Sequence, residues 1–210
     1  MPEVSKARLI KGYRAFRSGE YLEQKALYEA LGEGQHPRVM LVACSDSRVD
    51  PTDIFNACPG EMFVARNVAN IVPQYKPWGP HHCTSATVEY AVNILKVKLI
   101  IVLGHENCGG VAGCLAGMGD DPVENFVGAW VSQLNTARDR VVGSVADKDG
   151  WQPALEHEGI RQSLENLTGF PCVRAAVEAG ELGLLGAYFS IRTAELMFTD
   201  TDGNFAPVDN

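Results

Sequence analysis

The sequence predicts an α/β fold in which a mostly parallel β-sheet is flanked by helices. Short apolar runs rich in β-branched residues read as buried strands. Longer segments with helical periodicity separate these runs, and strands that alternate with helices imply βαβ units. The chain has 210 residues, which is enough for one substantial core. We therefore expect a single domain over residues 1–210.

The first expected element is a helical arm over about residues 1–34. Leucines and aromatic residues recur among charges from residue 5 to residue 30, and Ser18-Gly19 weakens or divides this helix. The strands are expected over residues 38–43, 61–65, 98–103, 182–190 and 193–198. The later helices are expected over residues 84–96, from 109 onward, over 122–142 and over 153–167, with a proline-rich loop over 73–80.

Charge and composition exclude several classes of partner. The formal net charge is -8 and there is no long basic run, whereas phosphate binding needs clustered lysine and arginine. The N-terminal residues contain no long apolar stretch, so we expect no signal peptide and no membrane anchor. The expected location is cytoplasmic, with neither nucleic acid nor a membrane as a partner.

Three residues form a candidate metal centre. Cys44 follows the first strand, His105 follows the strand over residues 98–103, and Cys108 comes three residues later. Because ligands in α/β sheets gather at the carboxyl ends of strands, we expect these side chains to converge. Thiolate and imidazole together suit zinc, and three protein ligands leave one position open, as in catalytic zinc sites.

The other cysteines are expected to be structural. The sequence contains no C-x-x-C pair and no export signal, which favours reduced thiols over a disulfide framework. A lone cysteine usually behaves as a small apolar residue. This expectation applies to Cys58, Cys83, Cys114 and Cys172.

Asp46 and Arg48 lie two and four residues after Cys44. Asp46 has two alternative roles: accepting a hydrogen bond from water on the zinc, or coordinating the zinc and closing the site. Arg48, with its forked donor group, can hold the carboxylate away from the metal. An ordinary surface ion pair between Asp46 and Arg48 would contribute little to stability. The position of both residues beside a metal ligand favours a functional role instead.

Five motifs in the same order resemble the β-class carbonic anhydrases. They are C-S-D-S-R at 44–48, P-G-E-M-F at 59–63, R-N-V-A-N at 66–70, E-Y-A-V at 89–92 and G-H-x-x-C-G-G at 104–110. The resemblance is strong over residues 35–111 and weaker through the C-terminal half. It implies the β-carbonic anhydrase fold and reversible hydration of carbon dioxide to bicarbonate by zinc-bound hydroxide.

The resemblance also implies roles for single residues. Cys44, His105 and Cys108 would hold one Zn²⁺ per subunit, and Asp46 and Arg48 would be the catalytic carboxylate–arginine dyad. The implied substrate-binding residues are Gln35, Phe63, Val68, Tyr90 and Gly109. In the family, the glutamine and several pocket residues come from the neighbouring subunit. A homodimer or dimer of dimers is therefore implied, with the N-terminal arm packed on the partner.

Two departures from the family pattern concern the state of the site. Members that bicarbonate inhibits in a closed form have tryptophan where this chain has Leu41, so we predict a constitutively open site. Some plant relatives have histidine where this chain has Ile94, which leaves the proton shuttle unassigned. The candidates are His36, His81, His82 and His157, each of which is expected to be an ordinary surface histidine.

Two alternative functions fit the same metal ligands. A zinc hydrolase acting on carbonyl sulfide or carbon disulfide would use the same ligands, and the motifs around the metal do not separate it from an anhydrase. A non-enzymatic zinc-binding domain would instead have a closed shell, with Asp46 as a permanent fourth ligand.

Overall fold

The computed structural model describes residues 5–77, 82–121 and 125–208. The chain divides into two compact units, Met1–His36 and Pro37–Asn210. The expected loop residues 78–80, the start of the helix expected over 122–142 and the histidine at position 81 lie outside the described residues. Within the described residues, no helix has the length and apolar character needed to cross a membrane.

The N-terminal unit consists of three short helices, α1 (Lys6–Ser18), α2 (Glu20–Glu23) and α3 (Lys25–Leu31). The Ser5 side chain begins α1 by accepting a hydrogen bond from the Arg8 N–H, which is ordinary N-capping. The predicted break falls at Gly19, whose ψ of -101° ends α1. Rings of Phe16, Tyr21 and Tyr28 contact one another, while no residue of the three helices is buried.

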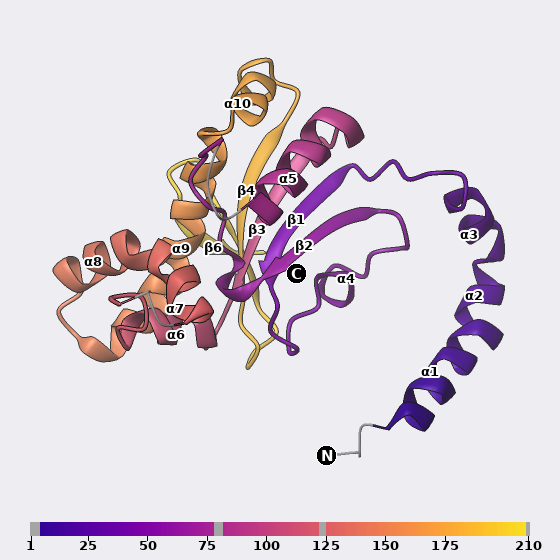
Figure 1. The fold of residues 1–210 in the computed structure, drawn as a ribbon, viewed down its shortest axis with the longest axis horizontal. Coiled ribbons are helices and arrows are strands. Elements are labelled where there is room, and N and C mark those ends of the chain that lie inside the picture. Colours follow the sequence, from indigo (N-terminus) through magenta and orange to yellow (C-terminus); the bar gives the residue numbers. More distant parts are fainter. Residues whose placement is uncertain (1–4, 78–81, 122–124, 209–210) are drawn as a thin grey trace. The chain divides into compact units, whose positions relative to one another are not determined.

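A six-stranded sheet forms the second unit, in the order β2-β1-β3-β4-β5-β6 (Figure 1). The strands are β1 (Val39–Cys44), β2 (Met62–Asn67), β3 (Leu99–His105), β4 (Gly183–Phe189), β5 (Leu196–Thr199) and β6 (Phe205–Pro207). The first four run parallel, and the last two are antiparallel. The predicted class, α/β with a mostly parallel sheet, is confirmed.

Helices account for most of the remaining chain. They are α4 (Pro51–Ile54), α5 (His82–Tyr90), α6 (Gly109–Leu115), α7 (Phe126–Val131), α8 (Asn135–Ser144), α9 (Trp151–Thr168) and α10 (Pro171–Glu178). Single turns of other helix types are η1 (Val68–Asn70), η2 (Ala91–Leu95), η3 (Ser132–Leu134) and η4 (Lys148–Gly150). Three elements, α4, α10 and β6, are not predicted from the sequence, and each has eight residues or fewer.

Two expected helices have a different form. The segment expected over 84–96 changes from α-helix to a π-turn at η2, and Lys96 ends it with a left-handed φ of 57°. Its predicted apolar stripe is nevertheless buried at Val88, Ala91 and Val92. The segment expected over 122–142 is two helices, α7 and α8, joined by the 3-10 turn η3.

The two faces of the parallel strands are buried against different layers. Met40, Val42, Ile100 and Val102 belong to a cluster that includes residues of α5, α9 and α10. The alternating residues, such as Leu41 and Ala43, pack in a second cluster with residues of α4. Burial on both faces explains why these strands read as unbroken apolar runs.

Close packing brings α9 against the carboxyl end of β3. A Cβ atom added at Gly104 would lie 2.7 Å from Ile160 Cδ1, and one at Gly186 would lie 3.0 Å from Ile160 Cγ2. Only glycine at these strand positions lets the helix approach so closely. Nearer its start, α9 contacts the loop that follows His105, because Glu156 Oε1 accepts the Cys108 N–H there.

Candidate metal centre

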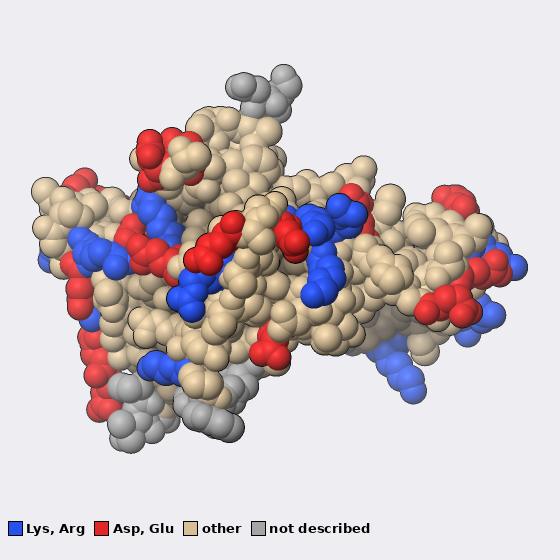
Figure 2. Space-filling model, turned by 90° about the horizontal axis from the view of Figure 1, so that it is seen from above, with Lys and Arg blue, Asp and Glu red and all other residues tan. Residues whose placement is uncertain are grey.

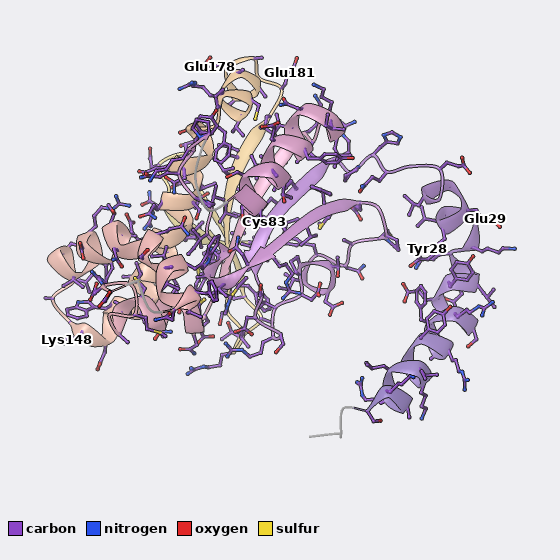
Figure 3. All side chains as sticks on the ribbon, viewed as in Figure 1. Tyr28, Glu29, Cys83, Lys148, Glu178 and Glu181 are labelled. Atoms are coloured by element: carbon purple, nitrogen blue, oxygen red, sulfur yellow. The ribbon has the colours of Figure 1, made fainter. Side chains whose placement is uncertain are left out.

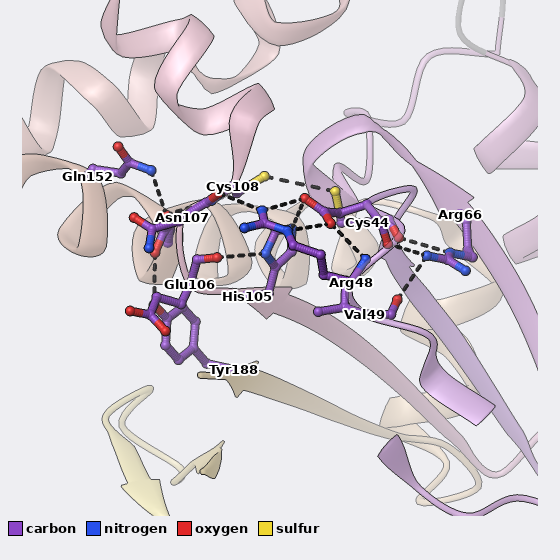
Figure 4. A network of polar contacts seen from close by, with 12 residues as sticks. Cys44, Arg48, Val49, Arg66, His105, Glu106, Asn107, Cys108, Gln152 and Tyr188 are labelled. Carbon is purple, nitrogen blue, oxygen red and sulfur yellow. Dashed lines mark hydrogen bonds and ion pairs between the residues drawn. The ribbon is translucent and has the colours of Figure 1, made fainter. Parts of the chain in front are cut away.

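Cys44, His105 and Cys108 converge in one buried cluster, as the sequence predicts (Figure 4). Cys44 is the last residue of β1 and His105 the last residue of the adjacent β3, so each strand runs slightly further than expected. Cys108 is the N-cap residue of α6. The ligand atoms lie within 4.8 Å of one another, with 3.9 Å between the two sulfur atoms.

The chemistry of this donor set fits a zinc ion. His105 Nδ1 lies 2.9 Å from the Glu106 carbonyl oxygen, a contact that orients the ring through its Nδ1–H. Its Nε2 atom is buried and has no hydrogen-bond partner among the described residues. A buried imidazole nitrogen without a partner, facing two sulfur atoms, is the arrangement expected of a metal ligand.

The sulfur atoms of Cys44 and Cys108 form a hydrogen bond with each other. The pKa of Cys44 is lowered to about 4, chiefly by the hydrogen bond with Cys108 and also by contacts with His105 and with the backbone N–H groups of Asp46 and Ala69, while burial acts in the opposite direction. The same bond, together with burial, raises the pKa of Cys108. Binding of a metal ion would require both sulfurs as thiolates.

Residues with left-handed backbone lie in both loops beside the cluster. Ala69, whose N–H lowers the pKa of Cys44, has a φ of 62°. Asn107, just before Cys108, has a φ of 54°. Such values are uncommon for residues other than glycine and concentrate at functional sites.

Asp46 is held by Arg48 through two side-chain hydrogen bonds (Figure 4). Arg48 Nε lies 2.9 Å from Asp46 Oδ1, and Arg48 Nη2 lies 2.7 Å from Asp46 Oδ2. These bonds keep the pKa of Asp46 well below its ordinary value. The carboxylate lies outside the ligand cluster, with its Oδ2 3.9 Å from His105 Nε2. This geometry corresponds to the alternative in which Arg48 holds the carboxylate.

Arg66 braces the loop that carries Cys44 and Asp46, a role the sequence analysis missed. Its guanidinium donates to the carbonyl oxygens of Cys44 (2.9 Å), Asp46 (2.7 Å) and Val49 (2.8 Å), and to Asp50 Oδ2 (3.0 Å). Arg66 lies on β2 opposite Ala43 of β1, so it reaches across the carboxyl end of the neighbouring strand. The only sequence signal for this role is that Arg66 begins the R-N-V-A-N motif at residues 66–70.

Within the second unit, the predicted substrate-binding residues fall into two pairs. Gly109 adjoins Cys108, and Val68 lies so close to Gly110 that a Cβ there would be 2.6 Å from Val68 Cγ1. Phe63 and Tyr90 instead form a separate aromatic pair, with ring centroids 5.8 Å apart. Gln35 belongs to the N-terminal unit.

The remaining cysteines differ from one another. Cys114 is buried and Cys172 is half-buried, but Cys58 and Cys83 are exposed. Cys83 lies on α5 (Figure 3). The expectation of apolar core residues is therefore wrong for Cys58 and Cys83, because both lie on the surface of the second unit.

His157 is not the surface histidine that the sequence analysis expected. On α9 it stacks on Phe205 with ring centroids 4.3 Å apart and meets Tyr188 edge-on at 4.4 Å. Burial lowers the pKa of His157 to about 4. A ring enclosed in this way is unsuited to carry protons to solvent, whereas His36 is exposed.

Replacing His157 by phenylalanine is expected to stabilise the protein at pH 5 relative to the wild type. The unfolded chain protonates this ring near its ordinary pKa of about 6.5, but the folded chain does so only near 4. Stability is therefore lost as the pH falls through this window, by at most about 3 kcal/mol. The measurement is the free energy of unfolding in urea of both proteins, at pH 7 and at pH 5. If the free energy of unfolding depended on pH equally in both proteins, the prediction would be wrong. The control is His36→Phe, at an exposed histidine.

The comparisons with known proteins agree with the geometry. The family model described as carbonic anhydrase matches residues 39–196. A carbonic anhydrase of Synechocystis sp. (strain ATCC 27184 / PCC 6803 / Kazusa) is 34% identical over 196 residues, which is 92% of this chain and 70% of that relative.

Two solved structures extend the similarity to the fold. The β-carbonic anhydrase CcaA matches with a TM-score of 0.88 and 31% identity, covering 97% of this chain and 92% of that one. A tetrameric β-carbonic anhydrase of the filamentous ascomycete Sordaria macrospora matches with a TM-score of 0.78 and 27% identity, covering 97% and 96%.

Proposed function

Because the chain belongs to the β-carbonic anhydrase family, we propose that it converts carbon dioxide to bicarbonate at a zinc ion. Cys44, His105 and Cys108 would hold that ion. The observation that carries the proposal is the buried cluster of two sulfurs and one partnerless imidazole nitrogen. A zinc ion there would lower the pKa of a water molecule in the open position toward about 7.

Asp46 and Arg48 would manage the proton of that water. The carboxylate would accept a hydrogen bond from it, and the 3.9 Å between Asp46 Oδ2 and His105 Nε2 supports this role. Arg48 keeps Asp46 ionised and also donates to the Asn107 carbonyl oxygen at 3.0 Å. It thereby ties the two loops that carry the ligands together.

The remaining pocket would be shared between two copies of the chain. Phe63 lies four residues before the end of β2, about 13 Å along the strand, and its partner Tyr90 is 46% exposed. This separation supports a pocket in which Phe63, Tyr90 and Gln35 serve the neighbouring subunit. Gln35 and the Gly109 N–H would then donate to the bicarbonate oxygen, in a homodimer or dimer of dimers.

The exposed charges are consistent with a small-molecule substrate. On the face seen in Figure 2, acidic and basic side chains are interspersed, without a broad basic surface. The absence of nucleic acid from the expected partners stays a prediction. The cytoplasmic location stays a prediction.

We expect strong carbon dioxide hydration already near pH 7, measured by stopped flow on zinc-replete protein from pH 6.5 to 9. Arg48 holds the Asp46 carboxylate off the cluster, and Leu41 is buried among apolar residues. Activity only at alkaline pH would contradict the open site. No hydration at any pH with zinc bound would overturn the proposed function, and sulfide release from carbonyl sulfide would then identify a sulfur-substrate hydrolase.

A further inference from the structure

A buried carboxylate lies directly behind one of the three ligands. Glu156 of α9 is only 4% exposed. Its Oε1 accepts hydrogen bonds from the Cys108 backbone N–H at 3.0 Å and from Gln152 Nε2 at 3.1 Å. Its Oε2 accepts one from the Tyr188 hydroxyl at 2.8 Å. These contacts join α9, β4 and the ligand loop.

Burying a carboxylate is costly unless it is fully hydrogen-bonded. Three donors from separate elements meet this need, and a carboxylate without a proton is purely an acceptor. Burial and the bond to Glu156 raise the pKa of Tyr188, so its hydroxyl stays a donor. The side chain is thus held in one place from three sides, without an ion pair to any described residue.

The Cys108 N–H needs this acceptor. Cys108 is the N-cap residue of α6, and the first N–H groups of a helix have no acceptor within it. Cys108 is 1% exposed, so water does not replace the missing partner. Glu156 therefore satisfies a donor that would otherwise be buried and unpaired.

The loop is held from the opposite side as well. Arg48 Nη2 donates to the carbonyl oxygen of Asn107 at 3.0 Å, and Asn107 has a left-handed φ of 54°. The peptide between Asn107 and Cys108 is therefore bound at its oxygen by Arg48 and at its N–H by Glu156. Because the orientation of this peptide sets where the Cys108 side chain points, both contacts control the position of its sulfur.

We propose that Glu156 is a positioning residue for Cys108, acting as the hydrogen-bond acceptor that aims the sulfur at the bound cation. This role rests on the proposed zinc site. It is anchored in rigid structure, because Ile160, one turn further along α9, packs against Gly104 of β3. Partners of metal ligands commonly contribute about 10–100-fold to metal affinity.

The test compares Glu156→Met, which has no strong acceptor, with Glu156→Gln, whose amide oxygen can still accept the Cys108 N–H. Zinc affinity is measured by competition with a chromophoric chelator, and the thiolate bands of the cobalt-substituted protein report the position of the sulfur. Glu156→Met should bind zinc about 10–100-fold more weakly, with altered bands. Glu156→Gln should stay close to the wild type.

Ser163→Ala is the matched control. Ser163 lies on the same helix. Its hydroxyl accepts the buried Val72 N–H at 3.1 Å and donates to the Asn70 carbonyl oxygen at 3.4 Å, and neither bond involves Cys44, His105 or Cys108. This variant should lower the melting temperature of the metal-free protein and leave zinc affinity and the cobalt bands unchanged. If it weakened zinc binding as much as Glu156→Met, the effect would be general destabilisation and the proposal would be wrong.

Other outcomes are equally decisive. Unchanged zinc affinity in Glu156→Met overturns the proposal. Equally weakened zinc binding in Glu156→Gln also overturns it, because the negative charge of Glu156 would then matter and not its hydrogen bond to Cys108. If Glu156→Met does not fold, Tyr188→Phe is used instead, because it removes a donor that holds the carboxylate. Weaker zinc binding by Tyr188→Phe supports the positioning role. Unchanged zinc binding by Tyr188→Phe overturns it. A wild-type protein that binds no zinc would instead overturn the proposed function.

Discussion

Replacing Cys44 by serine is expected to abolish zinc binding and reduce carbon dioxide hydration to the uncatalysed rate. Cys44 is 5% exposed and supplies one of three ligand atoms in the cluster. A serine hydroxyl is shorter, does not ionise near neutral pH and is not among the usual zinc ligands. Two remaining ligands would not hold the ion. The measurement is zinc content after gel filtration, followed by stopped-flow assay.

Cys114→Ser is the control for this substitution. Cys114 is also buried, but its sulfur donates a hydrogen bond to Asn135 Oδ1 and is not part of the cluster. Its serine variant should keep one zinc per chain and its activity, even where its melting temperature falls. Retention of stoichiometric zinc and full turnover by Cys44→Ser would show that the metal site lies elsewhere.

Asp46→Asn is expected to keep zinc but lose most of the hydration activity, on the order of 10²-fold or more. The amide has almost the same shape as the carboxylate, and it lies outside the ligand cluster. However, it no longer carries the charge that Arg48 binds, and its nitrogen can donate but not accept a hydrogen bond. The measurement is kcat together with zinc content on the same preparation.

Asp120→Asn provides the matched comparison. Asp120 is also paired with an arginine, with its Oδ1 2.6 Å from Arg138 Nη1, but it takes no part in the metal cluster. This variant should retain wild-type kcat. Full turnover in Asp46→Asn would refute the dyad mechanism, while loss of zinc from Asp46→Asn would give the carboxylate a structural role.

The ligand set was predictable because it depends on chain topology alone. Buried apolar runs identified β1 and β3, and their carboxyl ends meet at one edge of a parallel sheet. Cys44 and His105 occupy those ends, although each strand includes its ligand as the last residue. The pairing of Asp46 with Arg48 also followed from short spacing within one loop.

Contacts between distant elements were not predictable in the same way. Glu156 and His157 are neighbours in a helix with the expected periodicity. That periodicity does not show that Glu156 contacts Cys108 or that His157 stacks on Phe205 of β6. Arg66 reaches its acceptors only because β2 pairs with β1. Short elements such as α10 carry too few residues for periodicity to emerge.

The origin of the cluster in two paired strands links metal acquisition to folding. Cys44 and Cys108 are 64 residues apart, and only the pairing of β1 with β3 brings them together. An unfolded chain therefore offers no preformed site, and a zinc ion would bind only the assembled sheet. Free zinc at 100 times its dissociation constant would add about 2.7 kcal/mol to the free energy of unfolding. Zinc supply would thus govern how long the protein persists as well as how fast it works.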